Sequence, residues 1–348
     1  MNGEGARARP TMNDVARSAG VSLKTVSRVV NGETTVAPEL AARVRIAVEK
    51  LNYRPHIGAS MLRRNDRSTR TIGLLVEDVG NPFSAALHRA VEDEARRRGV
   101  HVLTGSLDED PERERELARA FAQRNADGLI ITPVDDDQSY LAAELADDCP
   151  VVFVDRPATG LPADSVLSTN VTGATEAVRH LISHGHRRIA FLGDNIRIAT
   201  ARSRYQGYLD ALAEARLEPV ATHELHQSTA AESATMSLFR SDNPPTALFT
   251  SQNLVTIGAV RALRRLRLHR EVALVGFDDF PTADLLEPAV TVIAQDPAVM
   301  GATAARALFD RIDGGSPLPP REFWIPTALI RRGSGELPPT QAQNTMML

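Results

Sequence analysis

Apolar residues near the N-terminus recur at helical spacing in short segments separated by polar turns. The first helix is expected to begin where Thr11 and Asp14 can satisfy free backbone N–H groups. Its narrow apolar face consists of Val15, Ala16 and Ala19. Gly20 follows and supplies the permissive backbone that a tight turn between two helices requires.

Two more helices are predicted after this turn. The second extends from a cap at Ser22 to about Asn31, with an inward face of Val26, Val29 and Val30. The third spans 38–51, because Pro38 suits a first helical position and precedes a buried stripe of Leu40, Val44, Val48 and Leu51. Three such helices are typical of a helix-turn-helix module, whose second helix offers its N-terminal turn to the major groove of DNA. A small helical bundle without a ligand is the alternative.

From Thr71 onward, short apolar runs alternate with amphipathic stretches. Strands are expected over 71–77, 100–105, 128–133, 150–155, 188–193, 246–251, 272–279 and 290–295. Helices are expected between most of them, over 83–98, 112–124, 171–184, 202–215, 254–268 and 297–312. This alternation predicts an α/β fold with two doubly wound parallel sheets and a ligand cleft outside the carboxyl ends of the strands.

The same patterns divide the chain into segments. They predict a head over 10–55, a polar linker over 56–70, an α/β body over 71–335 and a disordered tail over 336–348, where apolar periodicity is lacking. Within the body, the first subdomain is expected to combine about 71–160 with 297–325, and the second about 161–293 with 326–332.

Charge is distributed unevenly along the 348 residues, whose net charge is −4. Residues 1–70 hold thirteen Lys and Arg against six Asp and Glu, a net +7, which leaves −11 for the remainder. This asymmetry indicates a nucleic-acid-binding module on an acidic body. A single cysteine, Cys149, excludes an intrachain disulfide, and the sequence shows neither a signal-peptide pattern nor a membrane-spanning run. A cytoplasmic protein is expected.

Three stretches of the head are distinctive: NDVARSAGVSLKTVSRVVNG, VAPEL and LNYRP. Together they resemble the DNA-binding head of the lactose/galactose-repressor (LacI/GalR) family. Arginine suits a bidentate contact with guanine, and hydroxyl groups near a helix N-terminus suit phosphate. The resemblance implies base-reading roles for Leu23, Lys24 and Arg28, and phosphate contacts for Thr25, Ser27 and Asn31.

The resemblance extends into the linker. It implies that residues 56–70 contain a hinge helix that folds on DNA and inserts Leu62 into the minor groove, where an apolar wedge can unstack a base step. Gly58 and Ser60 replace residues that are more often helix-favouring or basic at these positions. A less stable hinge helix is therefore expected.

Further stretches carry the likeness through the body: IGLLVEDVGNPFSAAL, DGLIITP, VVFVDRP, HLISHGHRRIAFLG, ALFTSQNLVTIGAVRAL and VALVGFDDF. They resemble the family's effector domain, itself related to periplasmic sugar-binding proteins, so the resemblance spans about residues 11–332. It implies a small polar effector, most simply a sugar, in the cleft between the subdomains. The residues expected to bind it are Phe83, Asp155, Arg156, Arg202, Arg204, Gln252, Asp278 and Gln295.

Elementary chemistry supports this assignment. A carboxylate at a strand end, such as Asp278, suits bidentate binding of hydroxyl groups, and carboxylates, arginines and amides around one aromatic ring are typical of a polyol site. The resemblance implies that a second stacking aromatic is common at the position of Ser84, so its absence here favours a ligand that is smaller, more polar or not a sugar. The alternative is structural: inward packing for Phe83, a salt bridge for the Asp155–Arg156 pair, and helix starts or caps for the others.

Three classes of function compete. A transport-type sugar-binding protein accounts for the body alone and leaves the head unexplained. An enzyme is disfavoured, because the first strand leads into VEDVGNPFS without a phosphate-cradling glycine pattern, and HGHRR (184–188) is more typical of a basic helix terminus than of a metal site. We therefore expect a non-enzymatic, effector-controlled repressor without metal or cofactor. As a homodimer it would bind a pseudo-palindromic operator.

Overall fold

The computed structural model describes residues 10–30, 33, 35–53, 68–146, 149–314 and 319–339. The chain forms two compact units, residues 1–69 and 70–348, and each is described by itself.

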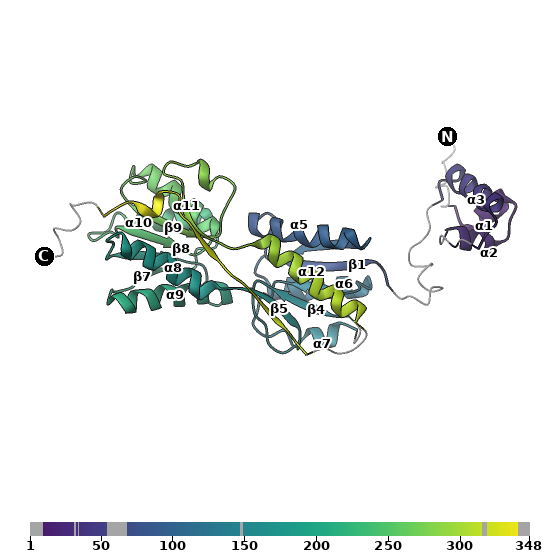
Figure 1. Ribbon diagram of the computed structural model, residues 1–348, viewed down its shortest axis with the longest axis horizontal. Helices are drawn as coiled ribbons and strands as arrows, with labels where there is room; N and C mark the ends of the chain where they lie inside the picture. Colours follow the sequence, from purple (N-terminus) through teal and green to yellow (C-terminus); the bar gives the residue numbers. More distant parts are fainter. Residues whose placement is uncertain are drawn as a thin grey trace, which may run out of the picture. The chain divides into compact units, whose positions relative to one another are not determined.

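The N-terminal unit contains three helices, α1 (Met12–Ala19), α2 (Leu23–Val30) and α3 (Pro38–Lys50) (Figure 1). They share a small core that includes Val15, Ala19, Val26, Val44 and Tyr53. The third helix buries Ala41, Val44 and Ala47, whereas the predicted Leu40 is only partly buried. Small residues at the helix crossing let three short helices form one core.

Local bonds fix the turn between the first two helices. Thr11 and Asp14 form a reciprocal capping box, and Gly20 adopts the left-handed backbone (φ 61°) that ends α1. The Ser22 hydroxyl caps α2 by accepting a hydrogen bond from the Thr25 N–H at 3.1 Å. A guanidinium from the third helix completes the turn, because Arg43 Nη2 donates to the Ala19 carbonyl at 2.6 Å.

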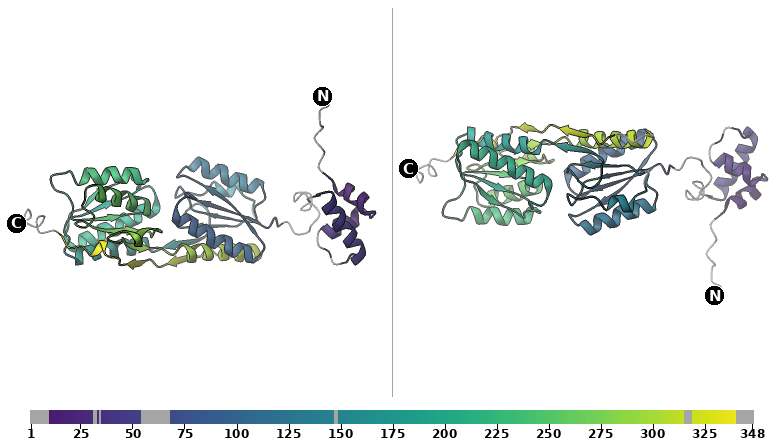
Figure 2. Two further views of the ribbon diagram at one scale, coloured as in Figure 1. Left: turned by 90° about the horizontal axis from the view of Figure 1, so that it is seen from above. Right: turned by 90° about the horizontal axis from the view of Figure 1, so that it is seen from below.

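The second unit contains two six-stranded sheets with the same strand order (Figures 1 and 2). The first sheet has the order β2 (His101–Ser106), β1 (Thr71–Val76), β3 (Leu129–Ile131), β4 (Val151–Val154), β5 (Asp164–Ser168) and β11 (Glu322–Ile325). The second has the order β7 (Val220–Thr222), β6 (Ile189–Leu192), β8 (Ala247–Thr250), β9 (Ala273–Phe277), β10 (Thr291–Ala294) and β12 (Ala328–Ile330). All neighbours are parallel except β12, which runs antiparallel to β10. Each strand of one sheet thus has a counterpart in the other.

Helices cover both faces of each sheet. On the first sheet, α5 (Pro82–Arg97) and α12 (Pro297–Asp313) enclose one apolar core, and α6 (Pro111–Gln123) with α7 (Leu141–Glu144) covers the other. On the second sheet, α8 (Asn170–Ser183) and α9 (Ala199–Ala215) lie on one face, and α10 (Ser228–Leu238) and α11 (Asn253–Arg265) on the other. The predicted α/β architecture with two doubly wound sheets is confirmed.

The subdomain boundary lies later than the predicted one at residue 160. Strand β5 belongs to the first sheet, so the chain first crosses between subdomains near residue 169. The apolar pattern did not predict β5 because the first residue of this strand, Asp164, is a buried carboxylate. Asp164 accepts hydrogen bonds from Arg311 and from the Arg321 N–H (2.8 Å), which satisfies its charge inside the fold.

The predicted tail also begins too early. A short 3₁₀ turn, η2 (Ser334–Glu336), packs against the second sheet, and the Glu336 carboxylate accepts a hydrogen bond from the Thr291 hydroxyl at 2.8 Å. The Leu337 carbonyl lies 2.8 Å from Nε2 of the buried His186. These polar contacts and the packing of the single Leu337 against the second sheet's core anchor this segment, and hydrophobic periodicity does not detect such anchors. Residues from 340 onward lie outside the described part.

Candidate functional site

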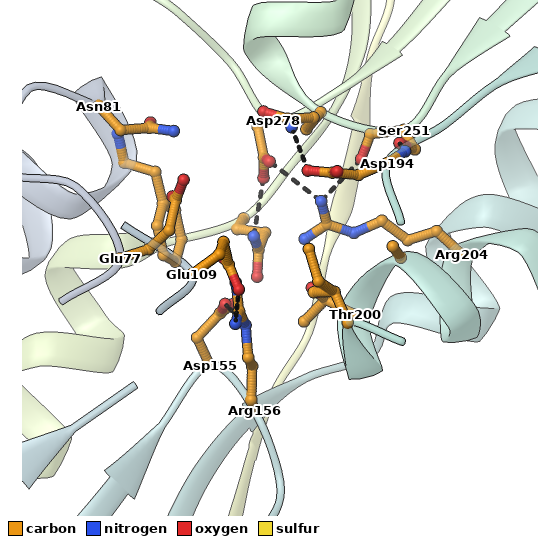
Figure 3. A pocket seen from close by; sticks show the side chains of 15 residues that line it. Glu77, Asn81, Glu109, Asp155, Arg156, Asp194, Thr200, Arg204, Ser251 and Asp278 are labelled. Atoms are coloured by element: carbon orange, nitrogen blue, oxygen red, sulfur yellow. Dashed lines mark hydrogen bonds and ion pairs between the residues drawn. The ribbon is translucent and has the colours of Figure 1, made fainter. Parts of the chain in front are cut away.

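Polar side chains follow the carboxyl ends of strands in both sheets and surround one cavity (Figure 3). The space between these side chains, its open mouth included, is about 460 Å³. Its lining combines acidic, basic, amide, hydroxyl and apolar side chains: Glu77, Asn81, Phe83, Glu109, Asp155, Arg156, Asp194, Ile198, Thr200, Ala201, Arg204, Ser251, Gln252, Asp278 and Gln295.

Arg204 organises the side of the cavity formed by the second subdomain. Its buried guanidinium donates to the Asn170 amide oxygen (2.8 Å), the Ser251 carbonyl (2.7 Å) and Asp278 Oδ2 (3.2 Å). Gln295 Nε2 donates to the other Asp278 oxygen at 2.7 Å. Both oxygens of Asp278 are therefore occupied by protein donors, and the guanidinium is held in one orientation.

Arg156 is a buried arginine on the side of the cavity formed by the first subdomain. Its guanidinium donates to both oxygens of Glu109, one bond measuring 2.9 Å, and to the Pro133 carbonyl at 3.2 Å. The neighbouring Asp155 is 8% exposed, and its Oδ1 has no hydrogen-bond partner among the described residues. Burial raises the pKa of Asp155 to about 6, although Arg204 and Arg156 oppose the shift. One buried acceptor in this wall thus lacks a hydrogen-bond partner among the described residues.

An acidic group lies at another edge of the cavity. Asp194 accepts from His226 Nδ1 at 2.9 Å and from Gln252 Nε2 at 2.8 Å, and His226 Nε2 lies 3.6 Å from Glu77 Oε1. The hydrogen bond to Asp194 raises the pKa of His226 to about 9, so the imidazole is protonated near neutral pH. Burial and the nearby Glu109 raise the pKa of Glu77 to about 7.

Among the described residues, contacts between side chains join the two subdomains around the cavity. Besides the Glu77–His226 contact, Asn253 Nδ2 donates to Asn81 Oδ1 at 2.8 Å, and Arg202 Nη2 donates to Asp136 at 3.0 Å. In each contact one residue belongs to the first subdomain and the other to the second, so these contacts hold the two walls of the cavity together. They are the bonds that any change in the angle between the subdomains must alter.

The exposed side of α2 carries the predicted DNA-contacting residues. Leu23, Lys24 and Arg28 are exposed, whereas Thr25 and Ser27 are half-buried beside them. Arg28 Nε lies 3.4 Å from Glu33 in an exposed ion pair. Such a pair is weak in water and does not fix the Arg28 side chain in one place. Asn31 and Leu62, the other two predicted positions, lie outside the described residues.

Comparisons with known proteins agree on the family. The model of "Bacterial regulatory proteins, lacI family" matches residues 11–56, and that of "Periplasmic binding protein-like domain" matches residues 178–335. A ribose operon repressor of Haemophilus influenzae is 33% identical over 307 residues, which cover 87% of this chain and 92% of that protein. The chain belongs to the lacI family.

Solved structures support this membership. A lac repressor dimer bound to operator and an anti-inducer is 25% identical with a TM-score of 0.81, over 94% of this chain and 99% of that one. A putative ribose operon repressor from Burkholderia thailandensis is 33% identical with a TM-score of 0.68, over 75% and 98% of the two chains. This lacI-family protein is a DNA-binding transcriptional regulator with an effector domain, and it is not an enzyme.

The structure brings together seven of the eight residues that the sequence assigned to the cleft. Arg202 is the exception: its side chain is half exposed and pairs with Asp136 instead of lining the cavity. Its neighbour Arg204 points inward because the two residues lie on different faces of α9.

Several lining residues escaped the sequence analysis, notably Glu77, Asn81, Glu109, Asp194 and Ser251. Glu77 directly follows β1, and Asp194 follows β6 by two residues, so the strand-end rule that indicated Asp155 would also have found them. Glu109 lies three residues beyond β2 with a left-handed backbone (φ 57°), and no local pattern marks it.

Two negative findings concern the described residues alone. No helix in the described ranges is long and apolar enough to cross a bilayer. No group of three or more His, Cys, Asp or Glu side chains in those ranges is arranged to hold a metal ion. In the HGHRR segment, His184 lies at the C-terminus of α8 with Nδ1 2.9 Å from the His180 carbonyl.

Proposed function

We propose that this regulator represses transcription in the cytoplasm from a pseudo-palindromic operator, and that a hydroxyl-rich, sugar-like effector in the cleft controls its operator affinity. The relatives named as ribose operon repressors and the operator-bound dimer of the lac repressor support this proposal. As a homodimer, the chain would place two heads on two half-sites.

The observation that carries the effector class is a set of buried polar atoms without partners on residues that line a polar cavity. Asp155 Oδ1, Arg156 Nε and Gln295 Oε1 are buried and have no hydrogen-bond partner among the described residues, and all three residues line the cavity. Two acceptors and one donor match the mixed character of hydroxyl groups, which both donate and accept. The ring of Phe83 adds an apolar face on which a sugar ring can stack.

The contacts between the subdomains supply the switch. An effector that binds more tightly when the two walls are together favours the state with the Arg202–Asp136 and Asn253–Asn81 bonds, and an effector that favours the open state breaks them. Only the difference in affinity between the two states moves the equilibrium. The change in angle would reach the DNA through the chain between residues 53 and 68, where the hinge helix is predicted.

In the head, α2 would read the operator. Arg28 is the residue best suited to guanine, Leu23 and Lys24 would contact neighbouring base edges, and Thr25 and Ser27 would contact phosphate.

The test has two steps on the full chain. Selection from a random DNA pool defines the operator, and calorimetry with D-ribose and other monosaccharides identifies a ligand. Operator affinity is then measured by fluorescence anisotropy with and without that ligand. A ligand that binds the cleft and changes operator affinity supports the proposal. Absence of binding by every monosaccharide, or binding that leaves operator affinity unchanged, contradicts it.

A further inference from the structure

The charges around the cavity do not balance. Five carboxylates face it or its rim, on Glu77, Glu109, Asp155, Asp194 and Asp278. Three cationic groups accompany them, and each already has a carboxylate of its own: Arg156 with Glu109, Arg204 with Asp278, and His226 with Asp194. Glu77 and Asp155 are left over.

Neither remaining carboxylate is neutralised by a close partner. The ion pair of Glu77 within the described residues is the 3.6 Å contact to His226, whose other ring nitrogen already bonds to Asp194. Arg156 Nε lies 3.9 Å from Asp155 Oδ2 while its terminal nitrogens are held by Glu109, and Asp155 Oδ1 has no partner. Asp155 is also more than nine-tenths buried and lines the cavity, so its free oxygen indicates a ligand independently of the acidic group.

The two carboxylates lie in different surroundings. The strongest electrostatic partners of Asp155 are two cations, Arg204 and Arg156, ahead of Asp278 and Glu109. The strongest electrostatic partner of Glu77 is another acid, Glu109, ahead of Arg156, His226 and Asp194. One end of the cavity is therefore suited to hydroxyl groups and the other to positive charge.

Unpaired carboxylates in a protein interior are costly, and a cation in the cavity removes this cost. An anionic ligand, such as a sugar phosphate, would add to the repulsion. A neutral sugar would leave Glu77 with its 3.6 Å contact to His226, a cation that Glu77 shares with Asp194. We infer that the effector is a polyhydroxylated molecule that carries a protonated amine, with the amine at the Glu77 end and the hydroxyl groups toward Asp155, Arg204 and Asp278.

This inference rests on the proposed function, because it specifies the chemistry of the effector in the same cleft. The direction of the Glu77 pKa agrees with it, because burial and repulsion by Glu109 raise that pKa and a bound cation would oppose both effects. The lining of the cavity contains several amide side chains and a single aromatic ring, that of Phe83. This composition suits a charged ligand, because such a ligand gains more from directed hydrogen bonds than from stacking on a ring.

The experiment compares matched ligands on the full chain. D-Ribose, D-xylose, D-glucose and D-galactose are each paired with the imino analogue in which a ring nitrogen replaces the ring oxygen. D-Glucosamine and D-galactosamine are compared with their parent sugars, and ribose phosphate is the anionic probe. Dissociation constants are measured by calorimetry near neutral pH, where the amines are protonated.

We expect the tightest ligand to be a cationic member and to bind at least roughly tenfold more tightly than its neutral partner, the factor that a charge-assisted hydrogen bond typically contributes. In Glu77→Gln this preference should fall toward equality, and in Glu77→Asp it should be intermediate because the charge is kept but displaced. Glu112→Gln removes an acid that is exposed on α6 and away from the cavity, and it should keep the preference. Melting temperatures show that each variant is folded.

The outcomes separate the two proposals. A neutral sugar or ribose phosphate that binds as tightly as, or more tightly than, every cationic member overturns the inference while leaving the proposed function in place. A preference for the cationic member that survives in Glu77→Gln also overturns it. If no compound of any kind binds, the sugar-like effector class of the proposed function fails, and the inference fails with it.

Discussion

The two subdomains of the effector domain place carboxylates at equivalent strand ends but partner them differently. Asp155 follows β4 and Asp278 follows β9, the fourth strand of each sheet, and both have a left-handed backbone (φ 70° and 67°). Asp278 has a protein donor on each oxygen, whereas Asp155 Oδ1 has none among the described residues.

The same contrast recurs at a second pair of strands. Glu77 follows β1 and Asp194 follows β6, which again have equivalent positions in the two sheets. Asp194 is held by His226 and Gln252, whereas Glu77 has a 3.6 Å contact to His226. Both of these acids in the second subdomain are therefore held by protein donors, whereas Asp155 and Glu77 in the first are less fully paired, and we propose that these two meet the ligand. Equal position in the fold does not mean equal function.

The largest expected effect is on stability and tests the hydrogen-bond network of Arg204 in the second subdomain. Arg204→Ala should lower the free energy of unfolding by about 3–5 kcal/mol, because it leaves the buried Asp278 and Asn170 without their partner. Arg202→Ala is the matched control on the same helix, and its exposed pair with Asp136 should contribute at most about 1 kcal/mol. Urea unfolding of both variants measures the difference. Equal losses would show that the Arg204 network is not the rigid element.

The next prediction separates the two strand-end aspartates. Asp155→Asn should weaken effector binding by about 1.5–3 kcal/mol, because a charged acceptor is lost. It should also stabilise the ligand-free protein near neutral pH. Asp278→Asn should instead destabilise the ligand-free protein, because the Arg204 charge loses its partner. Calorimetry and thermal unfolding of the two variants give both quantities.

The pH dependence provides the control for Asp155. Its pKa is raised from 3.8 to about 6 in the folded protein, so its contribution lowers stability as pH rises through that interval. The stabilising effect of Asp155→Asn should be absent below about pH 3.8, grow between the two values and level off above pH 6. A pH-independent difference between variant and wild type would mean that the carboxylate is not the source.

A substitution in the DNA-binding head should change operator recognition and leave the difference between the two subdomains of the effector domain unchanged. Arg28→Ala should cost about 1–3 kcal/mol at one operator base pair and relax the base preference there, because a bidentate contact is lost. Selection from a random DNA pool measures the preference, and calorimetry with the effector provides the control. An unchanged base preference would remove Arg28 from the base-reading residues.

The smallest expected effect concerns Asp194 in the second subdomain and its hydrogen bond from His226. The hydrogen bond from His226 to Asp194 raises the pKa of His226 from 6.5 to about 9, so its contribution is complete below pH 6.5 and is lost as pH rises to 9. His226→Gln should therefore lower the melting temperature at pH 6 and have progressively less effect toward pH 9. A difference that grows with pH would contradict the assignment of a protonated imidazole.

The sequence predicts the fold well where burial is apolar and poorly where it is polar. Runs such as LLV in β1 and VVFV in β4 are fully buried and were found by pattern. Strand β5 was missed because Asp164 and Ser165 interrupt its apolar character, and β7 is a three-residue edge strand whose residues are partly exposed. The segment at Ser334–Glu336 was missed for the same reason as β5.

The residues of the site could likewise be predicted only in part. Residues at strand ends can be found once the strands are known, because parallel strands bring their carboxyl ends together. Which of them is satisfied by a neighbour depends on side chains from distant parts of the chain. His226 and Gln252 lie 32 and 58 residues from Asp194. The sequence analysis relied most on Asp278, whereas the structure leaves Asp155 as the freer acceptor.

The central claim is that a ligand in the cleft controls DNA binding, and operator affinity measured by anisotropy tests it most directly. Wild type and Asp155→Asn are titrated with the selected operator, each with and without a fixed, subsaturating concentration of the tightest cleft ligand. We expect the ligand to change the operator affinity of the wild type and to have a much smaller effect on the variant. The same ligand-induced change in both proteins would contradict the account, because it would place control of DNA binding outside this cleft.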